Sequence, residues 1–132
     1  MCPAESDGST TASDLLEVEA RTHRRTALVA LRGELDLATA PQVAEVLDGL
    51  APDAEGVRHI VLDLRGLTFM DASGVHELIR QNNHARENRH NLAVVRGRAA
   101  IDRLLALTAV EEILVLVDDP ADLAPPLPEP LT

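Results

Sequence analysis

Residues 60–75 read IVLDLRGLTFMDASGV, and this stretch decides the fold. It begins with an almost continuous aliphatic run of strand length, which is typical of a strand buried on both faces of a sheet. A short loop is expected next, and Ser73 stands where a helix is predicted to begin. Because ligand and regulatory sites in open α/β sheets lie beyond such strand ends, we expect the functional site here.

The chain upstream of this stretch predicts two strands and one helix. Residues 15–20 and 27–31 are predicted strands, joined by a polar turn as an antiparallel hairpin, and Gly33 is expected to end the second strand. Thr39 and Gln42, with a proline between them, have the spacing of a capping box. A helix with one apolar stripe is therefore expected to follow Thr39.

The chain downstream alternates in the same way. A helix that begins near Ser73 is followed by a strand over residues 92–95, a third helix through residues 101–105 and a final strand over residues 113–117. Strands separated by single helices imply right-handed parallel crossovers. The sequence therefore predicts an α/β fold of order β-β-α-β-α-β-α-β, with a mixed sheet that is mostly parallel, has an antiparallel N-terminal edge and is packed by helices. The outer face of the helix after Ser73 is expected to carry His76, Glu77, Arg80, Gln81, Asn83 and Arg86.

The composition predicts one domain with an aliphatic core. The chain of 132 residues has the size of a single domain, and 45% of its residues are hydrophobic, with one Phe and neither Trp nor Tyr. We expect a disordered N-terminal tail at residues 1–13, a folded domain at residues 14–119 and an extended proline-rich tail at residues 120–132.

The charge and the cysteine content bear on partners and location. A formal charge of −10 disfavours direct binding to nucleic acid and to anionic membranes, because both would repel it, although solubility alone explains such a balance equally well. Cys2 is the only cysteine, which favours a reducing compartment. We expect neither a signal peptide nor a membrane span, and hence a cytoplasmic protein.

Ser73 has two compatible interpretations from its position alone. A serine at a helix start is most often an N-cap that stabilises the helix by about 1 kcal/mol, and Asp71 is a second candidate for that role. The unpaired N–H groups and the positive dipole end of a helix start would also stabilise a phosphate on the hydroxyl. Gly74 is expected to leave the hydroxyl uncovered by a neighbouring side chain.

Two motifs in the chain resemble one known family. Residues 69–75, FMDASGV, look like the signature of STAS-domain anti-sigma factor antagonists, in which an Asp-Ser-Ser-Gly or Asp-Ser-Thr-Gly motif holds a phosphorylated hydroxyl. Residues 32–40, RGELDLATA, are similar to the family's Gly-Glu-Leu-Asp loop before its first helix. The resemblance covers residues 15–122 in the same order of elements, and two motifs at matching spacing are a strong signal.

The resemblance implies a partner-switching regulator rather than an enzyme. In that family the unphosphorylated antagonist binds an anti-sigma factor that is also a serine kinase, and this binding frees a sigma factor for transcription. The kinase phosphorylates the antagonist, which then dissociates, and a serine phosphatase restores it. Ser73 occupies the phosphoacceptor position, where an added charge of about −1.5 to −2 would disrupt a close-packed interface. Neither a catalytic group nor a cofactor is expected.

The resemblance also implies a partner-binding surface around Ser73. Ala72 replaces the first hydroxyl of the family's usual pair, which leaves Ser73 as the clear acceptor, and His76 stands where the family commonly has a small residue. Capping bonds and solvated turns are the alternative roles for the carboxylates of this surface. Its predicted members are Gly33, Glu34, Asp36, Asp71, Ala72, Gly74 and His76.

Other chemistry has less support in the sequence. His76, His84 and His90 lack the i, i+4 spacing of a helical metal pair, so no metal site is predicted. Ser73, His76 and Asp71 lie within two turns of one segment, where the hydrogen-bond chain of a hydrolytic triad is hard to form. The alternative function is a STAS scaffold or sensor subunit of a larger signalling or transport complex without sigma-factor control. An exposed edge strand offers a route to a homodimer.

Overall fold

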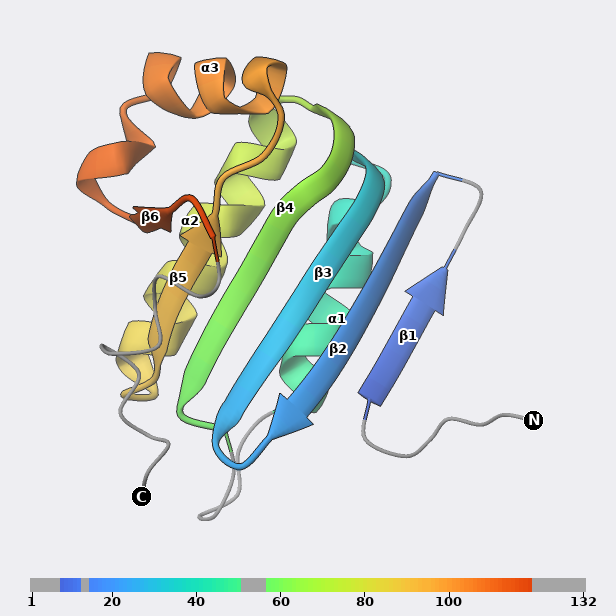
Figure 1. Cartoon of the computed structure of the whole chain (residues 1–132), viewed down its shortest axis with the longest axis vertical. Coiled ribbons are helices and arrows are strands. Elements are labelled where there is room, and N and C mark those ends of the chain that lie inside the picture. Colours follow the sequence, from blue (N-terminus) through green and yellow to red (C-terminus); the bar gives the residue numbers. More distant parts are fainter. Residues whose placement is uncertain (1–7, 13–14, 51–56, 120–132) are drawn as a thin grey trace.

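A mixed sheet forms the centre of the structure, which is a computed structural model that describes residues 8–12, 15–50 and 57–119. Within these residues the strands are β1 (Gly8–Ala12), β2 (Leu16–His23), β3 (Thr26–Leu35), β4 (His59–Met70), β5 (Asn91–Val95) and β6 (Val115–Val117). The helices are α1 (Ala40–Gly49), α2 (Ala72–Glu87) and α3 (Ala99–Leu107), with a 3₁₀ turn, η1 (Val110–Glu112), before β6 (Figure 1).

The strands lie in the sheet in the same order as in the sequence. β1, β2 and β3 are antiparallel neighbours, whereas every pair from β3 to β6 is parallel. Each parallel pair is joined through one helix, so α1, α2 and α3 are the crossover connections (Figure 1). The predicted α/β class is confirmed, as are the mostly parallel sheet, its antiparallel N-terminal edge and the hairpin between β2 and β3.

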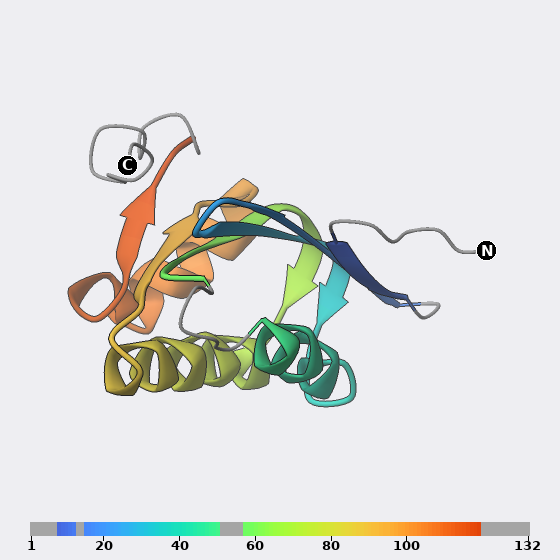
Figure 2. The same cartoon turned by 90° about the horizontal axis from the view of Figure 1, so that it is seen from below.

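The helices enclose an aliphatic core against the sheet. α1 and α2 lie side by side on one face of it (Figure 2), and α3 packs against β4. Side chains that point to this face are fully buried, because strand residues alternate between the two faces. Burying such a side chain stabilises the fold by about 1.5–3 kcal/mol. The core includes Val18, Val29, Leu31, Leu62 and Val94 from the strands and Val43, Leu78 and Leu105 from the helices.

Strand β1 lies where the sequence predicts a disordered tail. Residues 8–12 pair with β2, beginning with Gly8 opposite Arg21. The predicted disorder is wrong here. The segment has no alternation of apolar and polar residues, and its pairing depends on backbone N–H and C=O groups that bond to the otherwise open edge of β2. The rest of the predicted N-terminal tail and the predicted tail at residues 120–132 lie outside the described residues.

Strands β3 and β4 are longer than predicted. β3 continues through Gly33, which adopts a φ of 110° beside a register shift instead of ending the strand. A Cβ at this position would collide with the backbone oxygen of Leu15, so glycine is required. β4 continues to Met70 through the predicted loop, whereas β6 begins at Val115 rather than at residue 113. Through these extensions β3 and β4 end at the same edge of the sheet. β3 ends before the loop that leads to α1, and β4 ends directly before α2.

Candidate functional site

The carboxyl ends of β3 and β4 carry the residues of the predicted site. Glu34 is paired with Phe69 and Leu35 with Met70 across the two strands. The N–H of Asp71 donates to the carbonyl oxygen of Leu35 (3.3 Å), and α2 begins at the next residue. This pairing places the loop after β3 beside the start of α2, at the upper edge of the sheet in Figure 1.

Asp71, rather than Ser73, is the N-cap of α2. Its backbone is extended, and its Oδ1 atom accepts hydrogen bonds from the N–H groups of Ser73 (2.9 Å) and Gly74 (3.2 Å). The capping role considered for Ser73 is therefore wrong, and the capping alternative for Asp71 is confirmed. The expectation of unpaired N–H groups for a phosphate is also wrong at these two residues, because the carboxylate already binds them.

The hydroxyl of Ser73 is left without a structural role. The residue is half-buried in the first turn of α2, and its Oγ atom forms no hydrogen bond with any residue that the structure describes. Ala72 and His76 beside it are exposed. Within the described residues no base contacts this hydroxyl.

Gly74 permits close packing rather than exposing the hydroxyl, which corrects the prediction. The residue is buried, and a Cβ added to it would lie 2.9 Å from the carbonyl oxygen of Leu35 and 2.5 Å from the Cγ atom of Met70. Such distances are below van der Waals contact, so a side chain would push α2 away from the strand ends. The glycine therefore fixes the position of the helix start that carries Ser73.

The loop between β3 and α1 is held by its own side chains. Asp36 Oδ1 accepts hydrogen bonds from the N–H groups of Ala38 (3.0 Å) and Thr39 (3.1 Å). The hydroxyl of Thr39 donates to the carbonyl of Glu34 (2.8 Å) and accepts from the N–H of Asp36 (2.9 Å). Thr39 precedes α1 without capping it through its side chain, so the predicted capping box is wrong: the Gln42 side chain instead donates to the carbonyl of Leu16.

Two exposed apolar residues flank the site and were missed by sequence reasoning. Leu37 is 75% exposed in the loop after β3, and Phe69 is 46% exposed near the end of β4. Asp36 precedes Leu37 in the chain, and Glu34 is paired with Phe69 across the two strands. Two signals were available in the sequence: Leu37 directly follows Asp36 in the predicted loop, and Phe69 is the only Phe, Trp or Tyr of the chain. The carboxyl edge of β3 and β4 therefore exposes apolar side chains close in the chain or the sheet to acidic ones.

The predicted outer face of α2 is wrong at Glu77 and Gln81. Both side chains are buried, and Glu77 accepts hydrogen bonds from Gln81 Nε2 (2.7 Å) and from Arg80 Nη1 (3.0 Å). Because α1 packs along α2, a polar residue on the flank of α2 is covered although it faces away from the strands. The hydrogen bonds satisfy the buried carboxylate, which would otherwise be costly.

No metal site, Ser-His-Asp triad or membrane-spanning helix is found among the residues that the structure describes. No cluster of three or more His, Cys, Asp or Glu side chains there is placed to hold a metal ion. The carboxylate of Asp71 binds backbone N–H groups rather than His76. The helices of the described ranges are all too short or too polar to cross a lipid bilayer.

Comparisons with known proteins agree with this arrangement. Residues 17–123 match the STAS domain family. The anti-sigma F factor antagonist of Paenibacillus polymyxa is 31% identical over 104 residues, which cover 79% of this chain and 88% of the relative. An anti-sigma factor antagonist from Mycobacterium paratuberculosis superposes with a TM-score of 0.71 at 21% identity, covering 89% of this chain and 97% of that one. The Bacillus cell fate determinant SpoIIAA in its phosphorylated form gives a TM-score of 0.61 at 16% identity, over 82% and 97% of the two chains.

Proposed function

Because the chain belongs to the STAS domain family and is related to anti-sigma factor antagonists, we propose that it binds an anti-sigma factor and is released by phosphorylation of Ser73. The observation that carries this proposal is the hydroxyl of Ser73. It lies at the start of a helix that Asp71 caps, and it makes no hydrogen bond within the described residues. A similar fold is known in a phosphorylated form.

In the proposed cycle this chain has two partners and needs no catalytic group of its own. The unphosphorylated protein binds the anti-sigma factor in the cytoplasm, so that a sigma factor is freed for transcription. The anti-sigma factor, which is also a serine kinase, transfers the γ-phosphoryl group of ATP to Ser73 Oγ, and ADP and a proton leave. A serine phosphatase hydrolyses the phosphoserine with water and returns the protein to its binding form.

The partner surface in this proposal is the edge around Ser73. Leu37 and Phe69 supply the apolar contact, because they are the exposed large hydrophobic residues beside the helix start. Asp36 shapes its own loop through two hydrogen bonds, so its effect on the partner is chiefly to hold Leu37 in place. Gly33 and Gly74 serve this surface from within, because they let β3 lie close to β2 and α2 lie close to the strand ends. Ala72 is its small exposed residue, and Glu34 and His76 are its polar border.

Phosphorylation at Ser73 would act through charge. The carboxylate of Asp71 already occupies the N–H groups of Ser73 and Gly74, so a phosphate finds a negative neighbour rather than two open donors. It adds about −1.5 to −2 charges to an edge that already carries Asp71 and, beside it, Glu34 and Asp36. Like charges and the cost of burying them then disfavour the complex without any rearrangement of the fold.

The test is phosphorylation by a bound partner. The purified protein is mixed with candidate anti-sigma factor kinases, ATP and Mg²⁺, and the phosphate is located by mass spectrometry of peptides. We expect one phosphate, on Ser73, and none in the Ser73→Ala variant. Phosphate on another residue, or no phosphate with any kinase that binds, would contradict the proposal.

Two matched variants sharpen this experiment. Ala72→Ser restores a second hydroxyl next to the acceptor, and we expect phosphate to remain on Ser73, because Asp71 fixes the helix start around that residue. Thr68→Val removes the nearest exposed hydroxyl of β4 and should leave phosphorylation unchanged. Transfer of the phosphate to position 72 in the first variant would show that the cap does not select the acceptor.

A further inference from the structure

The opposite end of the sheet gathers positive charge on an acidic protein. The turn between β2 and β3, the start of β4 and the end of α2 all lie at the amino ends of the parallel strands, the lower edge of the sheet in Figure 1. Four of the five histidines belong to the same segments. We call this surface the basic edge, and its arginines are Arg24, Arg25, Arg58, Arg86 and Arg89.

Backbone hydrogen bonds hold the segments of the basic edge together. The carbonyl of Arg25 accepts from the N–H groups of Arg58 (2.7 Å) and His59 (3.0 Å). The carbonyl of Arg58 accepts in turn from the N–H of Asn91 (2.8 Å), whose side chain is 3.0 Å from His59 Nδ1. The positive side chains therefore project from segments that are hydrogen-bonded to one another. These segments cannot move apart to reduce the repulsion between the charges.

Most of the arginines outside the basic edge are paired with a carboxylate, although Arg98 and Arg103 form no ion pair with a described residue. Five other arginines each form an ion pair with a carboxylate, for example Arg32 with Glu19 and Arg65 with Asp63. No described residue forms an ion pair with Arg25, Arg58, Arg86 or Arg89. Two carboxylates of the described elements lie at this end, Asp48 and Glu87. Both are exposed, and the arginines of the basic edge outnumber them.

Backbone geometry does not explain why arginine stands at two of these positions. Arg24 and Arg89 have φ values of 60° and 62°, in the left-handed region where glycine or asparagine is preferred. Arg89 follows the C-cap of α2, where His90 N–H donates to Ala85 (2.7 Å) and Arg89 N–H to Arg86 (3.1 Å). This is the Schellman motif, whose left-handed position is usually glycine. The helix dipole accounts for basic residues within α2, but not for those in the other two segments.

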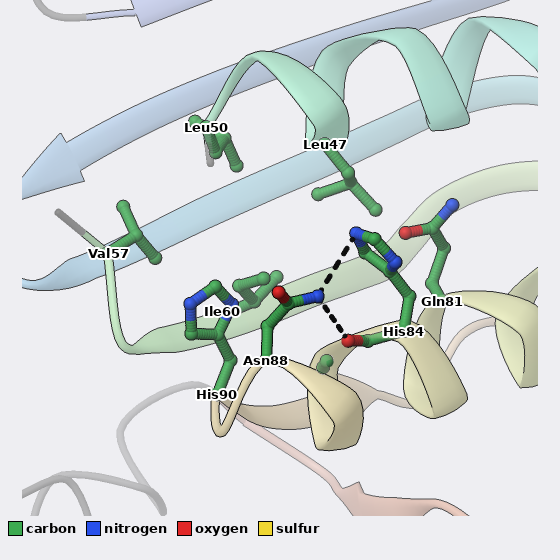
Figure 3. A pocket seen from close by; sticks show the side chains of 9 residues that line it. Leu47, Leu50, Val57, Ile60, Gln81, His84, Asn88 and His90 are labelled. Atoms are coloured by element: carbon green, nitrogen blue, oxygen red, sulfur yellow. Dashed lines mark hydrogen bonds between the residues drawn. The ribbon is translucent and has the colours of Figure 1, made fainter. Parts of the chain in front are cut away.

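A small pocket opens beside these charges. It has a volume of about 40 Å³ and lies between α1 and the end of α2 (Figure 3). One part of its lining is aliphatic and the other is polar. The polar side chains are partly engaged, since Asn88 Nδ2 donates to the carbonyl of His84 (2.8 Å) and lies 3.4 Å from the ring of the same residue. The volume suits the tip of one aliphatic side chain rather than a whole small molecule. The aliphatic part of the lining is Leu47, Leu50, Val57, Ile60 and Ala85, and the polar part is Gln81, His84, Asn88 and His90.

We propose that the basic edge binds an acidic segment of a partner protein, whose carboxylates face Arg25, Arg58 and Arg89 and whose one aliphatic side chain enters the pocket. Arginine clusters recognise acidic motifs through charge-assisted, bidentate hydrogen bonds. A protein segment fits better than nucleic acid, because the pocket beside the charges accepts an apolar group. This site is separate from Ser73, at the other end of the strands, so it does not depend on the proposed switch.

The test uses the full chain and a synthetic acidic peptide with glutamates on both sides of one leucine. Amide shifts are followed by NMR, and affinity by fluorescence anisotropy. We expect shifts confined to residues 24–26, 47–50, 57–60 and 81–91. We expect affinity to fall about tenfold when the peptide's leucine is replaced by alanine, because most of an aliphatic side chain is then lost from the pocket.

Protein variants separate a specific site from general charge. The double variant Arg58→Gln and Arg89→Gln should weaken peptide binding about tenfold or more. The matched double variant Arg98→Gln and Arg103→Gln removes the same charge from α3, at the other end of the sheet, and should bind like the wild type. Arg89→Gly keeps the turn that the backbone favours and should weaken binding while the fold is retained, which excludes unfolding as the cause.

Four results would overturn the proposal. These are no shift in the basic edge at millimolar peptide, equal losses in the two double variants, and stronger shifts of the same amides with duplex DNA than with the peptide. The fourth is a concentration-dependent shift of these amides without peptide, because a second copy of this chain would then occupy the surface.

Discussion

The two ends of the sheet place different residues at left-handed backbone positions. At the carboxyl end Gly33, with a φ of 110°, has no Cβ to collide with the neighbouring strand. At the amino end Arg24 and Arg89 occupy such positions in spite of the strain on a residue with a Cβ. The glycine is explained by geometry alone, whereas the arginines are better explained by the charge they bring to the basic edge.

The two ends also use their charged groups differently. At the carboxyl end Asp36 and Asp71 bind backbone N–H groups and thereby set the loop and the helix start. At the amino end Arg25, Arg58 and Arg89 form no ion pair with a described residue. The first end is built to hold one hydroxyl in place, and the second to offer charge to something outside the chain. The following predictions test this contrast, beginning with the largest expected effect.

Charge at Ser73 should abolish partner binding. We expect Ser73→Asp to weaken binding to the anti-sigma factor about a hundredfold, because it adds a negative charge next to Asp71, whereas Ser73→Ala should bind like the wild type. Isothermal titration calorimetry measures both. Arg58→Gln, at the other end, should leave this affinity unchanged. If Ser73→Asp bound with wild-type affinity, negative charge at this position could not be the signal that releases the partner.

A side chain at Gly33 should destabilise the fold strongly. Gly33→Ala forces a Cβ against the backbone oxygen of Leu15 and a left-handed conformation on alanine, so we expect a loss of about 2–4 kcal/mol in the free energy of unfolding. Urea denaturation gives the value. Gly49→Ala is the matched control, since a Cβ there meets no atom within 4 Å, and it should be neutral or slightly stabilising.

Removing the cap of α2 should have an intermediate effect. We expect Asp71→Ala to lower the free energy of unfolding by about 1–2 kcal/mol, because the N–H groups of Ser73 and Gly74 lose their acceptor. Asp71→Asn keeps an oxygen at the same place and should recover most of that stability in thermal denaturation. If both variants were equally unstable, the charge of Asp71 and not its capping bonds would be responsible.

Relieving the strain at Arg89 should stabilise the protein slightly. Glycine fits the left-handed position of the Schellman motif, so Arg89→Gly should raise the free energy of unfolding by about 0.5–1 kcal/mol. Chemical denaturation measures the gain, and Arg86→Gly, within α2, should instead be destabilising by about 1 kcal/mol. A loss of stability in Arg89→Gly would mean that the arginine contributes to the fold itself.

The smallest expected effect is a pH dependence of the free energy of unfolding, which comes from histidines at the amino ends of the parallel strands. Burial, followed by the positive charge of Arg58 and by His90, lowers the pKa of His59 below 6.5, and burial, His84 and Arg58 do the same for the pKa of His90. The unfolded chain therefore binds more protons than the folded one below about pH 6.5, so stability should fall as the pH drops below that value. Urea denaturation at pH 7.5 and 5.5 measures this fall.

The controls for the pH effect are histidine variants at both ends. The double variant His59→Gln and His90→Gln should lose less stability between the two pH values than the wild type does. His76→Gln, at the carboxyl end, should lose as much as the wild type. An unchanged fall in the double variant would assign the effect to other groups.

Much of the fold was predictable from local patterns. Aliphatic runs of strand length, such as residues 60–64, identified β2 to β5, and their alternation with helices identified the parallel crossovers. The position of Ser73 at a helix start was predictable because a buried strand leads into it. The strand β1 was not, since residues 8–12 carry no apolar pattern and are placed by the open edge of β2.

The site was predictable only in outline. The sequence left Ser73 and Asp71 both as candidate caps, and the choice between them depends on backbone angles that appear when β4 meets α2. Leu37 and Phe69 were missed because exposure of an apolar residue depends on which segments cover it. Glu77 was expected at the surface and is buried, because the packing of α1 against α2 is not encoded in the period of either helix.

The sequence by itself therefore determined the α/β class, the order of the elements from β2 onward and the helix start that carries Ser73, because short-range periodicity and turn chemistry act within one segment. Only the tertiary structure decided which carboxylate caps α2, why Gly74 must be small and how arginines from three separate segments come together at the basic edge. Each of these depends on parts of the chain that are distant in sequence and meet only when the parallel strands align their ends.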